Sequence, residues 1–96
     1  MRYKILLSKL AKKDLRNILL SLKEKTENLN LILQQQSEII DSVQSLDIFP
    51  ERHPLYNGKY NKQNLRKMVT KHYIILYRIH NNNVIIVKIF VQGMNI

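Results

Sequence analysis

Basic and aromatic side chains alternate along a stretch near the middle of the chain, and this mixture suits contact with nucleic acid. Residues 47–64 include both prolines and one of the two glycines, which predicts a loop. Cationic groups can hold phosphates while aromatic rings stack on bases. The same mixture also fits an ordinary loop of a basic protein, and both interpretations stay open. The residues concerned are Arg52, His53, Tyr56, Lys59, Tyr60 and Lys62.

Charge is distributed unevenly between the two halves of the sequence. The 96 residues have a formal net charge of +9. Residues 52–96 contain eight basic residues and no acidic one, whereas residues 1–51 contain eight basic and all seven acidic residues. Such a half-chain creates a positive field that attracts polyanions. The sequence therefore predicts a partner that is a nucleic acid, an anionic membrane or an acidic protein segment.

The composition disfavours several classes of site. The chain contains no cysteine, so it has no disulfide framework or thiolate metal site, which fits a reducing, cytoplasmic compartment. The three histidines lack the spacing of metal ligands, so neither a metal nor another cofactor is expected. No apolar run is long enough for a membrane span, and the N-terminus lacks the apolar core of a signal peptide. We expect one domain covering residues 1–96.

The first half of the sequence predicts one strand and two helices. Residues 2–7 alternate loosely as a strand does, and Ser8 can cap the helix that follows. Apolar residues then recur at helical spacing over residues 10–25 and 29–46, with a polar connection between them. Two such helices form a helical hairpin whose apolar face needs a sheet to lie on. The apolar positions are Ala11, Leu15, Ile18, Leu19 and Leu22, then Leu29, Ile32, Leu33, Ile39 or Ile40, Val43 and Leu46.

Residues 65–91 predict the rest of the sheet. Runs rich in Ile, Val and Tyr fill residues 73–80 and 84–91, and Asn81-Asn82 suits a two-residue hairpin turn because Asn tolerates positive φ. The sequence thus predicts an α+β fold in the order strand-helix-helix-strand-strand-strand, with the helical hairpin on one face of a small antiparallel sheet. The turn would pair Ile79 with Val84, Tyr77 with Ile86, Ile75 with Lys88 and Tyr73 with Phe90.

The two faces of the predicted hairpin differ in chemistry. We expect the nearly all-aliphatic face to pack on the helices and the face with aromatic bodies and polar tips to meet a partner; burial of both faces is the alternative. The aliphatic face carries Ile74, Leu76, Ile85, Val87 and Ile89. The other face carries Tyr73, Tyr77, Lys88 and Phe90 among Ile75, Ile79, Val84 and Ile86.

The order and spacing of these features resemble the RelE/ParE toxins of bacterial type II toxin–antitoxin systems, over nearly the whole chain. The resemblance implies a toxin that forms a hetero-oligomer with a small acidic antitoxin. RelE-like members cut mRNA at the ribosome without a metal, whereas ParE-like members poison DNA gyrase. The matching residues are Ser8, Ala11, Asp14, Leu15 and Ile18, then Leu46 and Pro50, then Leu65, Arg66, Val69, Tyr73, Ile75, Tyr77, Arg78 and Ile79.

Three positions depart from the nuclease members. Those members often carry an Arg after the tyrosine that Tyr73 matches and a His-Gln-Arg-Met-like end to the last strand, but this chain has Ile74, Val91 and Gly93 there. Cleavage through a 2′-hydroxyl needs a proton acceptor, a proton donor and a cation for the charged intermediate, and Val and Gly supply none of them. The resemblance leaves an impaired nuclease site whose candidate catalytic residues are Arg66, His72 and Tyr73.

The basic residues of the second half are the candidates for binding RNA or another target. The favoured interpretation is a growth-inhibiting toxin that resembles RelE-like mRNA interferases, with ribosome and mRNA as its targets. The alternatives are a ParE-like inhibitor of DNA gyrase, an attenuated relative that keeps antitoxin binding, and a basic RNA-binding module without a toxin role. The candidate binding residues are Arg52, Lys59, Lys62, Arg66, Lys67, Lys71 and Lys88.

Overall fold

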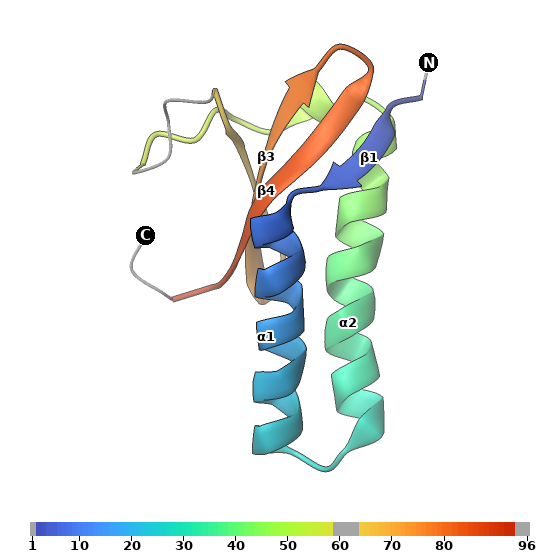
Figure 1. The fold of residues 1–96 in the computed structure, drawn as a ribbon, viewed down its shortest axis with the longest axis vertical. Helices are drawn as coiled ribbons and strands as arrows, with labels where there is room; N and C mark the ends of the chain where they lie inside the picture. Colours follow the sequence, from blue (N-terminus) through green and yellow to red (C-terminus); the bar gives the residue numbers. More distant parts are fainter. Residues whose placement is uncertain (1, 59–63, 94–96) are drawn as a thin grey trace.

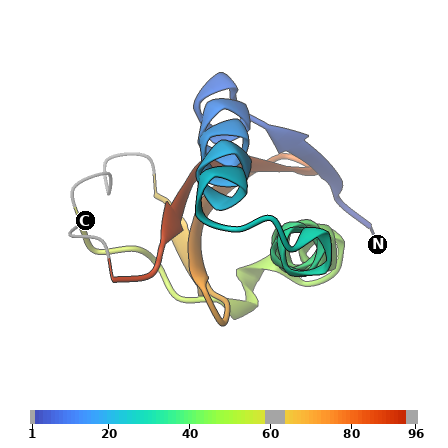
Figure 2. The same cartoon turned by 90° about the horizontal axis from the view of Figure 1, so that it is seen from below.

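The computed structural model describes residues 2–58 and 64–93 and consists of a sheet with a pair of helices on one side (Figures 1 and 2). The predicted α+β class and the predicted order of elements are confirmed. Within the described residues, no helix has the length and apolar character needed to cross a membrane. The elements are β1 (Lys4–Leu7), α1 (Lys9–Lys25), α2 (Leu29–Gln44), the short 3-10 helices η1 (Ser45–Asp47) and η2 (Pro50–Arg52), β2 (Arg66–Val69), β3 (Tyr73–His80) and β4 (Asn83–Val91).

The sheet is mixed rather than wholly antiparallel. Its strand order is β1-β4-β3-β2, and β1 runs parallel to β4 while the other neighbours are antiparallel. The first strand of the chain thus lies beside the last one, as Figure 1 shows. A parallel pair needs a long crossover connection, which here is the whole of the intervening chain.

The hairpin turn forms as predicted, but its register changes partway along the strands. Asn81 has a φ of 55°, and the predicted pairs Ile79–Val84 and Tyr77–Ile86 are present. The register then shifts between Leu76 and Tyr77. The predicted pairs Ile75–Lys88 and Tyr73–Phe90 are wrong, because a β-bulge inserts one extra residue into β4. The observed pairs are Leu76–Lys88, Ile75–Ile89, Ile74–Phe90 and Tyr73–Val91.

The prediction of which sheet face packs on the helices is wrong for most residues. Both tyrosines of β3 face the helices, because their hydroxyls find acceptors there: Tyr77 donates to the Pro50 carbonyl (2.5 Å) and Tyr73 to Gln35 Oε1 (2.8 Å). Ile89 is in the helix-side core, as expected. This core contains Ala11, Ile39, Val43, Leu46, Met68, Tyr73, Ile75, Tyr77, Val84, Ile86 and Ile89.

The opposite face of the sheet has a smaller core of its own. Leu76 is fully buried there, and Ile74 and Val87, which we expected on the helix side, pack against the same cluster. The segment before β2 covers this face and contributes Tyr56, so the alternative that both faces are buried is the correct one (Figure 2). The cluster consists of Tyr56, Leu65, Leu76 and Phe90.

Helix α1 continues the edge pairing that β1 begins. The predicted cap is confirmed, since the Ala11 N–H donates to Ser8 Oγ at 3.0 Å. The same hydroxyl donates to the Val87 carbonyl (3.0 Å), and the Ile89 N–H donates to the Asp14 carboxylate (3.0 Å). The side chains of the cap residue Ser8 and of Asp14 in the helix therefore satisfy backbone groups of β4 beyond the point where β1 ends.

Candidate functional site

The three candidate catalytic residues are not assembled at one point. Arg66 pairs with Tyr77 across β2 and β3, while His72 and Tyr73 lie at the other end of β3. At about 3.3 Å per strand residue, the two ends are roughly 13–16 Å apart. Arg66 Nη1 donates to the carbonyls of Glu51 (3.1 Å) and His53 (2.7 Å), so it ties the loop before β2 to the sheet.

His72 is fixed by a carboxylate of α2. Its backbone N–H donates to Glu38 Oε2 (2.7 Å), its Nδ1 lies 2.6 Å from Glu38 Oε1, and the Thr70 hydroxyl donates to Oε2 (2.6 Å). Burial alone would raise the pKa of Glu38, but the hydrogen bonds from Thr70 and His72 outweigh it and hold that pKa below its ordinary value. Glu38 is therefore an anion that fastens the turn between β2 and β3 to α2.

Tyr73 is a core residue rather than a surface group. It is 2% exposed, and its hydroxyl donates to Gln35 of α2. Burial, helped by the charge of Glu38, raises the pKa of Tyr73, so the phenol stays protonated near neutral pH. Tyr73 and Gln35 both line the pocket that opens at this end of the sheet.

The positions that differ from nuclease members lie beside His72. Val91 ends β4 opposite Tyr73, and the backbone N–H of Gln92 donates to the His72 carbonyl at 2.8 Å. A pocket of about 250 Å³ opens here between the two helices and the sheet, with Lys25, Lys71, His72 and Val91 among its lining residues. Ile74 faces away from it, toward the cluster on the other face. Val91 and Gly93 leave this end of the sheet without a second basic group of the predicted kind.

Several of the predicted binding residues have internal partners. Arg52 Nη1 donates to three carbonyls, those of Ser45 (3.1 Å), Ile48 (2.7 Å) and Phe49 (3.2 Å). Lys88 Nζ donates to Asp14 at 3.0 Å and lies 5.1 Å from the centre of the Phe90 ring. These contacts stabilise the fold, and a ligand would have to compete with them for Arg52 and Lys88.

The remaining basic candidates are less constrained or lie outside the described residues. Lys71 is exposed, and Lys67 is half-buried on β2. Lys59 and Lys62 belong to the part of the chain that the structure does not describe, as does Tyr60. Tyr56 is buried in the second cluster, so it is not available to stack on a base. The predicted alternation of basic and aromatic groups therefore does not form a continuous surface in the described part of the loop.

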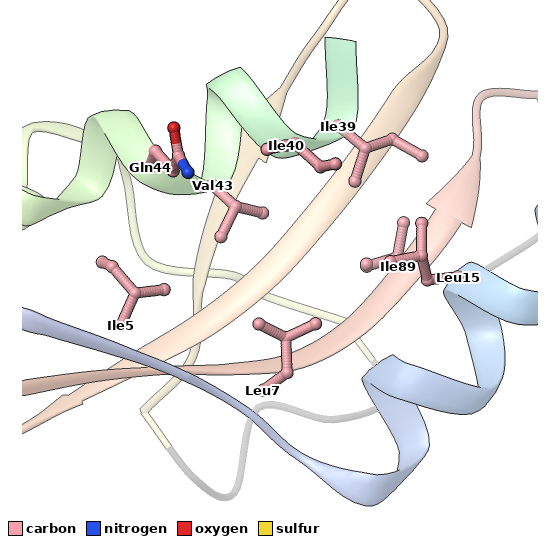
Figure 3. A pocket seen from close by; sticks show the side chains of 8 residues that line it. All are labelled: Ile5, Leu7, Leu15, Ile39, Ile40, Val43, Gln44 and Ile89. Carbon is pink, nitrogen blue, oxygen red and sulfur yellow. The ribbon is translucent and has the colours of Figure 1, made fainter. Parts of the chain in front are cut away.

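An apolar pocket was not foreseen from the sequence. Its volume is about 240 Å³, and it lies between β1, the two helices and β4, as Figure 3 shows. The adjacent pair Ile39 and Ile40 was the available signal, because a helix can direct only one of two neighbours to the centre of a core. Ile39 is buried, whereas Ile40 is 38% exposed at the pocket. The lining residues are Ile5, Leu7, Leu15, Ile39, Ile40, Val43, Gln44 and Ile89.

The sequence matches a known family over almost its full length. The model of the ParE toxin of the type II toxin–antitoxin system parDE matches residues 5–96. The chain belongs to the ParE toxin family. The predicted membership of the RelE/ParE superfamily and the predicted role as a toxin of a type II toxin–antitoxin system are thereby confirmed. No curated protein sequence is similar enough to count as a relative.

Solved structures share the fold of this ParE-family chain at low sequence identity. The chromosomal ParDE system of P. aeruginosa has a TM-score of 0.74 at 13% identity, covering 94% of this chain and 96% of that chain. The RelBE2 toxin–antitoxin complex of Mycobacterium tuberculosis has a TM-score of 0.68 at 15% identity, covering 98% and 95%. A conserved hypothetical protein of Helicobacter pylori has a TM-score of 0.63 at 17% identity, covering 95% and 96%. These likenesses extend to both ParDE and RelBE proteins.

Proposed function

We propose that this protein is a growth-arresting toxin that acts by binding its target and not by cutting RNA, and that a cognate antitoxin neutralises it. The observation that carries the proposal is the separation of Arg66 from His72 and Tyr73, each of which has an internal partner. General acid–base catalysis needs positioned groups within reach of the reacting atoms, and losing one costs about 10²–10⁴ in rate. The resemblance to ParE-like toxins points to DNA gyrase as the target.

The RelE-like alternative depends on His72. This side chain is 42% exposed and lies next to Lys71 at a pocket that Tyr73 also lines, and it is far more exposed than Tyr73. His72 with Lys25 and Lys71 at the same pocket would still lack the His and the Arg that the resemblance leads one to expect at positions 91 and 93. An impaired RelE-like nuclease is therefore the second candidate.

Induction of the toxin without its antitoxin tests the proposed function. Growth and the supercoiling of a resident plasmid are followed after induction, with co-expressed antitoxin as the control. We expect growth to stop and negative supercoiling to fall before protein synthesis falls. If protein synthesis stops first while supercoiling holds, the target is not gyrase. If neither changes, the protein is not an active toxin.

The antitoxin, we propose, supplies an acidic amphipathic segment to the apolar pocket of Figure 3. The pocket is lined almost wholly by aliphatic side chains, so a partner gains by burying apolar residues there. Lys12, Arg16 and Lys23 are exposed and share one face of α1, next to the face that carries Leu15. Acidic residues beside the apolar stripe of the partner would meet this basic face.

A further inference from the structure

His53 carries a ring nitrogen that the fold buries without a partner. The residue as a whole is half-buried, but its Nε2 exposes less than 1 Å² and has no hydrogen-bond partner among the described residues. The ring lies 6.3 Å from the Tyr77 ring in a T-shaped arrangement with an interplanar angle of 89°. Nearly all buried polar atoms of native proteins are hydrogen-bonded, so this nitrogen calls for an explanation.

Residues 48–54, called the latch segment below, connect the end of α2 to the sheet through their main-chain carbonyls. The Tyr77 hydroxyl of β3 donates to the Pro50 carbonyl (2.5 Å), and Arg66 Nη1 of β2 donates to the carbonyl of His53 itself (2.7 Å). No residue of the latch segment belongs to either hydrophobic cluster, although Pro50 is fully buried. The segment can therefore separate from the sheet while both clusters stay intact.

Phe49 makes the closed form of the latch segment strained. Its φ of 54° and ψ of 54° lie in the left-handed region. A bulky side chain is uncommon there because its Cβ crowds the backbone, and such a conformation persists only where the surroundings enforce it. Arg52 Nη1 supplies part of that enforcement, since it donates to the carbonyls of Ile48 (2.7 Å) and Phe49 (3.2 Å). Opening of the segment would relieve this strain.

The groups nearest to His53 make a positive charge on its ring unfavourable. Two guanidinium groups contact the latch segment, that of Arg52 within it and that of Arg66 on β2. Tyr77 beside the ring is a neutral phenol, because burial raises its pKa to about 12. Burial of the imidazole, and to a lesser degree the charge of Arg52, holds the pKa of His53 below its ordinary value.

The carboxylates near the latch segment have other partners. Residues 52–96 contain no acidic residue, so β2 and β3 offer no carboxylate to a charged His53. Glu51 accepts from the Tyr3 hydroxyl at 3.4 Å, and Asp47, just before the segment, pairs with Arg2 at 3.0 Å. A proton on the His53 ring would therefore gain no counter-ion in the closed form.

We propose that protonation of His53 opens the latch segment, which makes residues 48–54 an acid-sensitive joint between α2 and the sheet. A charged imidazole has an N–H at both nitrogens, so one of them would lie at the buried Nε2 without an acceptor. In the open form the ring is in water and takes the proton at its ordinary pKa of ~6.5. This joint is a property of the fold and does not depend on the target of the toxin.

The sign of the pH dependence follows from the state that binds the proton. The open form binds it more readily, so the closed form is fully stable above about pH 6.5 and loses stability as pH falls below that value. The loss ends where the pH reaches the pKa of His53 in the closed form. With one proton taken up on opening, the ratio of open to closed molecules rises by up to ~10-fold for each pH unit in this window.

Hydrogen exchange of single amides in the purified full chain, between about pH 7.5 and pH 5.5, tests this joint. The Lys67 N–H, which donates to the Pro54 carbonyl (2.9 Å), reports on the latch segment. The Lys4 N–H, which donates to the Asn82 carbonyl (2.9 Å) at the other side of the sheet, is the control. After correction for the intrinsic pH dependence of exchange, we expect protection of Lys67 to fall by up to ~10-fold per pH unit. Protection of Lys4 should stay within about twofold.

Two variants separate His53 from other titrating groups. His53→Phe keeps an aromatic ring beside Tyr77 but binds no proton, so the Lys67 amide should keep its protection down to about pH 5.5. His80→Gln removes an exposed imidazole near the β3–β4 turn and should respond to pH like the wild type. A titration of the His53 ring in the wild type by NMR needs no variant, and we expect its midpoint below ~6.5.

Every other outcome overturns the proposed joint. If the Lys67 amide keeps its protection in the wild type down to about pH 5.5, the latch segment does not open with acid. An equal loss in His53→Phe would show that another group titrates. A parallel loss at Lys67 and Lys4 would mean that acid unfolds the whole protein and not this segment. If His53→Phe fails to fold, a wild-type midpoint at or above ~6.5 still contradicts the role of His53.

Discussion

Glu38 shows how one residue joins two elements of this toxin. Its carboxylate accepts hydrogen bonds from the Thr70 hydroxyl and the His72 backbone and lies against the His72 ring, so it links α2 to the β2–β3 turn. Gln35, one helical turn earlier, holds the Tyr73 hydroxyl. These polar contacts lie at the sheet end where a nuclease site would be expected. His72 and Tyr73, the candidate catalytic residues at this end, bind side chains of α2.

Glu38 makes the stability of the protein depend on pH on the acid side. Its pKa in the folded state lies below its ordinary value, so its contribution is complete above the pKa of the unfolded chain, ~4.3, and is lost as pH falls through the folded pKa. We expect Glu38→Gln to lower the free energy of unfolding at pH 7 by about 1–2 kcal/mol. The difference from the wild type should shrink between about pH 5 and pH 3.

Urea unfolding at several pH values measures this difference directly. Glu27→Gln, which changes an exposed carboxylate between the helices, is the matched control and should be nearly neutral at every pH. A gap between wild type and Glu38→Gln that stays constant down to pH 3 would show that the charge of Glu38 is not what stabilises the turn.

At the residue scale, several side chains that the sequence suggested for phosphate binding or catalysis make structural hydrogen bonds instead. Arg66 and Arg52 carry guanidinium groups that can bind phosphate, but in the structure they donate to main-chain carbonyls of the loop. Every residue has such a carbonyl, so the sequence does not show which ones an arginine will contact. The same holds for Tyr73, whose acceptor comes from a helix far away in the sequence. The cap at Ser8 could be predicted because its partner is only three residues away.

At the element scale, the bulge in β4 decides which side chains form each core. Alternation along residues 73–80 and 84–91 predicted the strands and the turn, because both signals are local. One extra residue in β4 leaves no mark on that alternation, although it changes every later pair. The burial of the tyrosines against the helices depends on acceptors from α2 and η2, which is also non-local information.

Asp14 supports this irregular part of β4. Its two oxygens accept from Lys88 Nζ and the Ile89 N–H, both at 3.0 Å. Asp14→Ala should lower the free energy of unfolding by about 1–3 kcal/mol, because a poorly solvated N–H and an ammonium group lose their partner. Asp41→Ala, at an exposed position of α2, should cost under about 0.5 kcal/mol. Equal effects of the two substitutions in thermal or urea unfolding would contradict this role of Asp14.

The apolar pocket between the helices gives a prediction about the antitoxin. Ile40→Asp places a charge at the pocket, where we expect the apolar stripe of the antitoxin, and should weaken binding at least ~10-fold. Leu31→Asp is the matched control, since Leu31 lies on the same helix, is 40% exposed and does not line the pocket. Calorimetric titration with the purified antitoxin measures both. An equal loss in the two variants would place the antitoxin elsewhere.

At the scale of the whole molecule, the fold was the most predictable feature. Two amphipathic helices and a hairpin of β-rich runs leave few ways to bury their apolar faces. The parallel pairing of β1 was not predicted, because a strand of four residues has little pattern of its own. Two lysines of the strongly basic second half of the chain, Lys59 and Lys62, lie outside the described residues.

The integrity of ribosome-bound mRNA tests the central claim most directly. Purified toxin, freed of antitoxin, is added to a reconstituted translation reaction, and the lengths of the mRNA are measured over time. We expect the mRNA to stay at full length, with or without the further change His72→Gln. Cleavage at defined positions that depends on translating ribosomes and disappears in His72→Gln would contradict the claim and make His72 a catalytic residue.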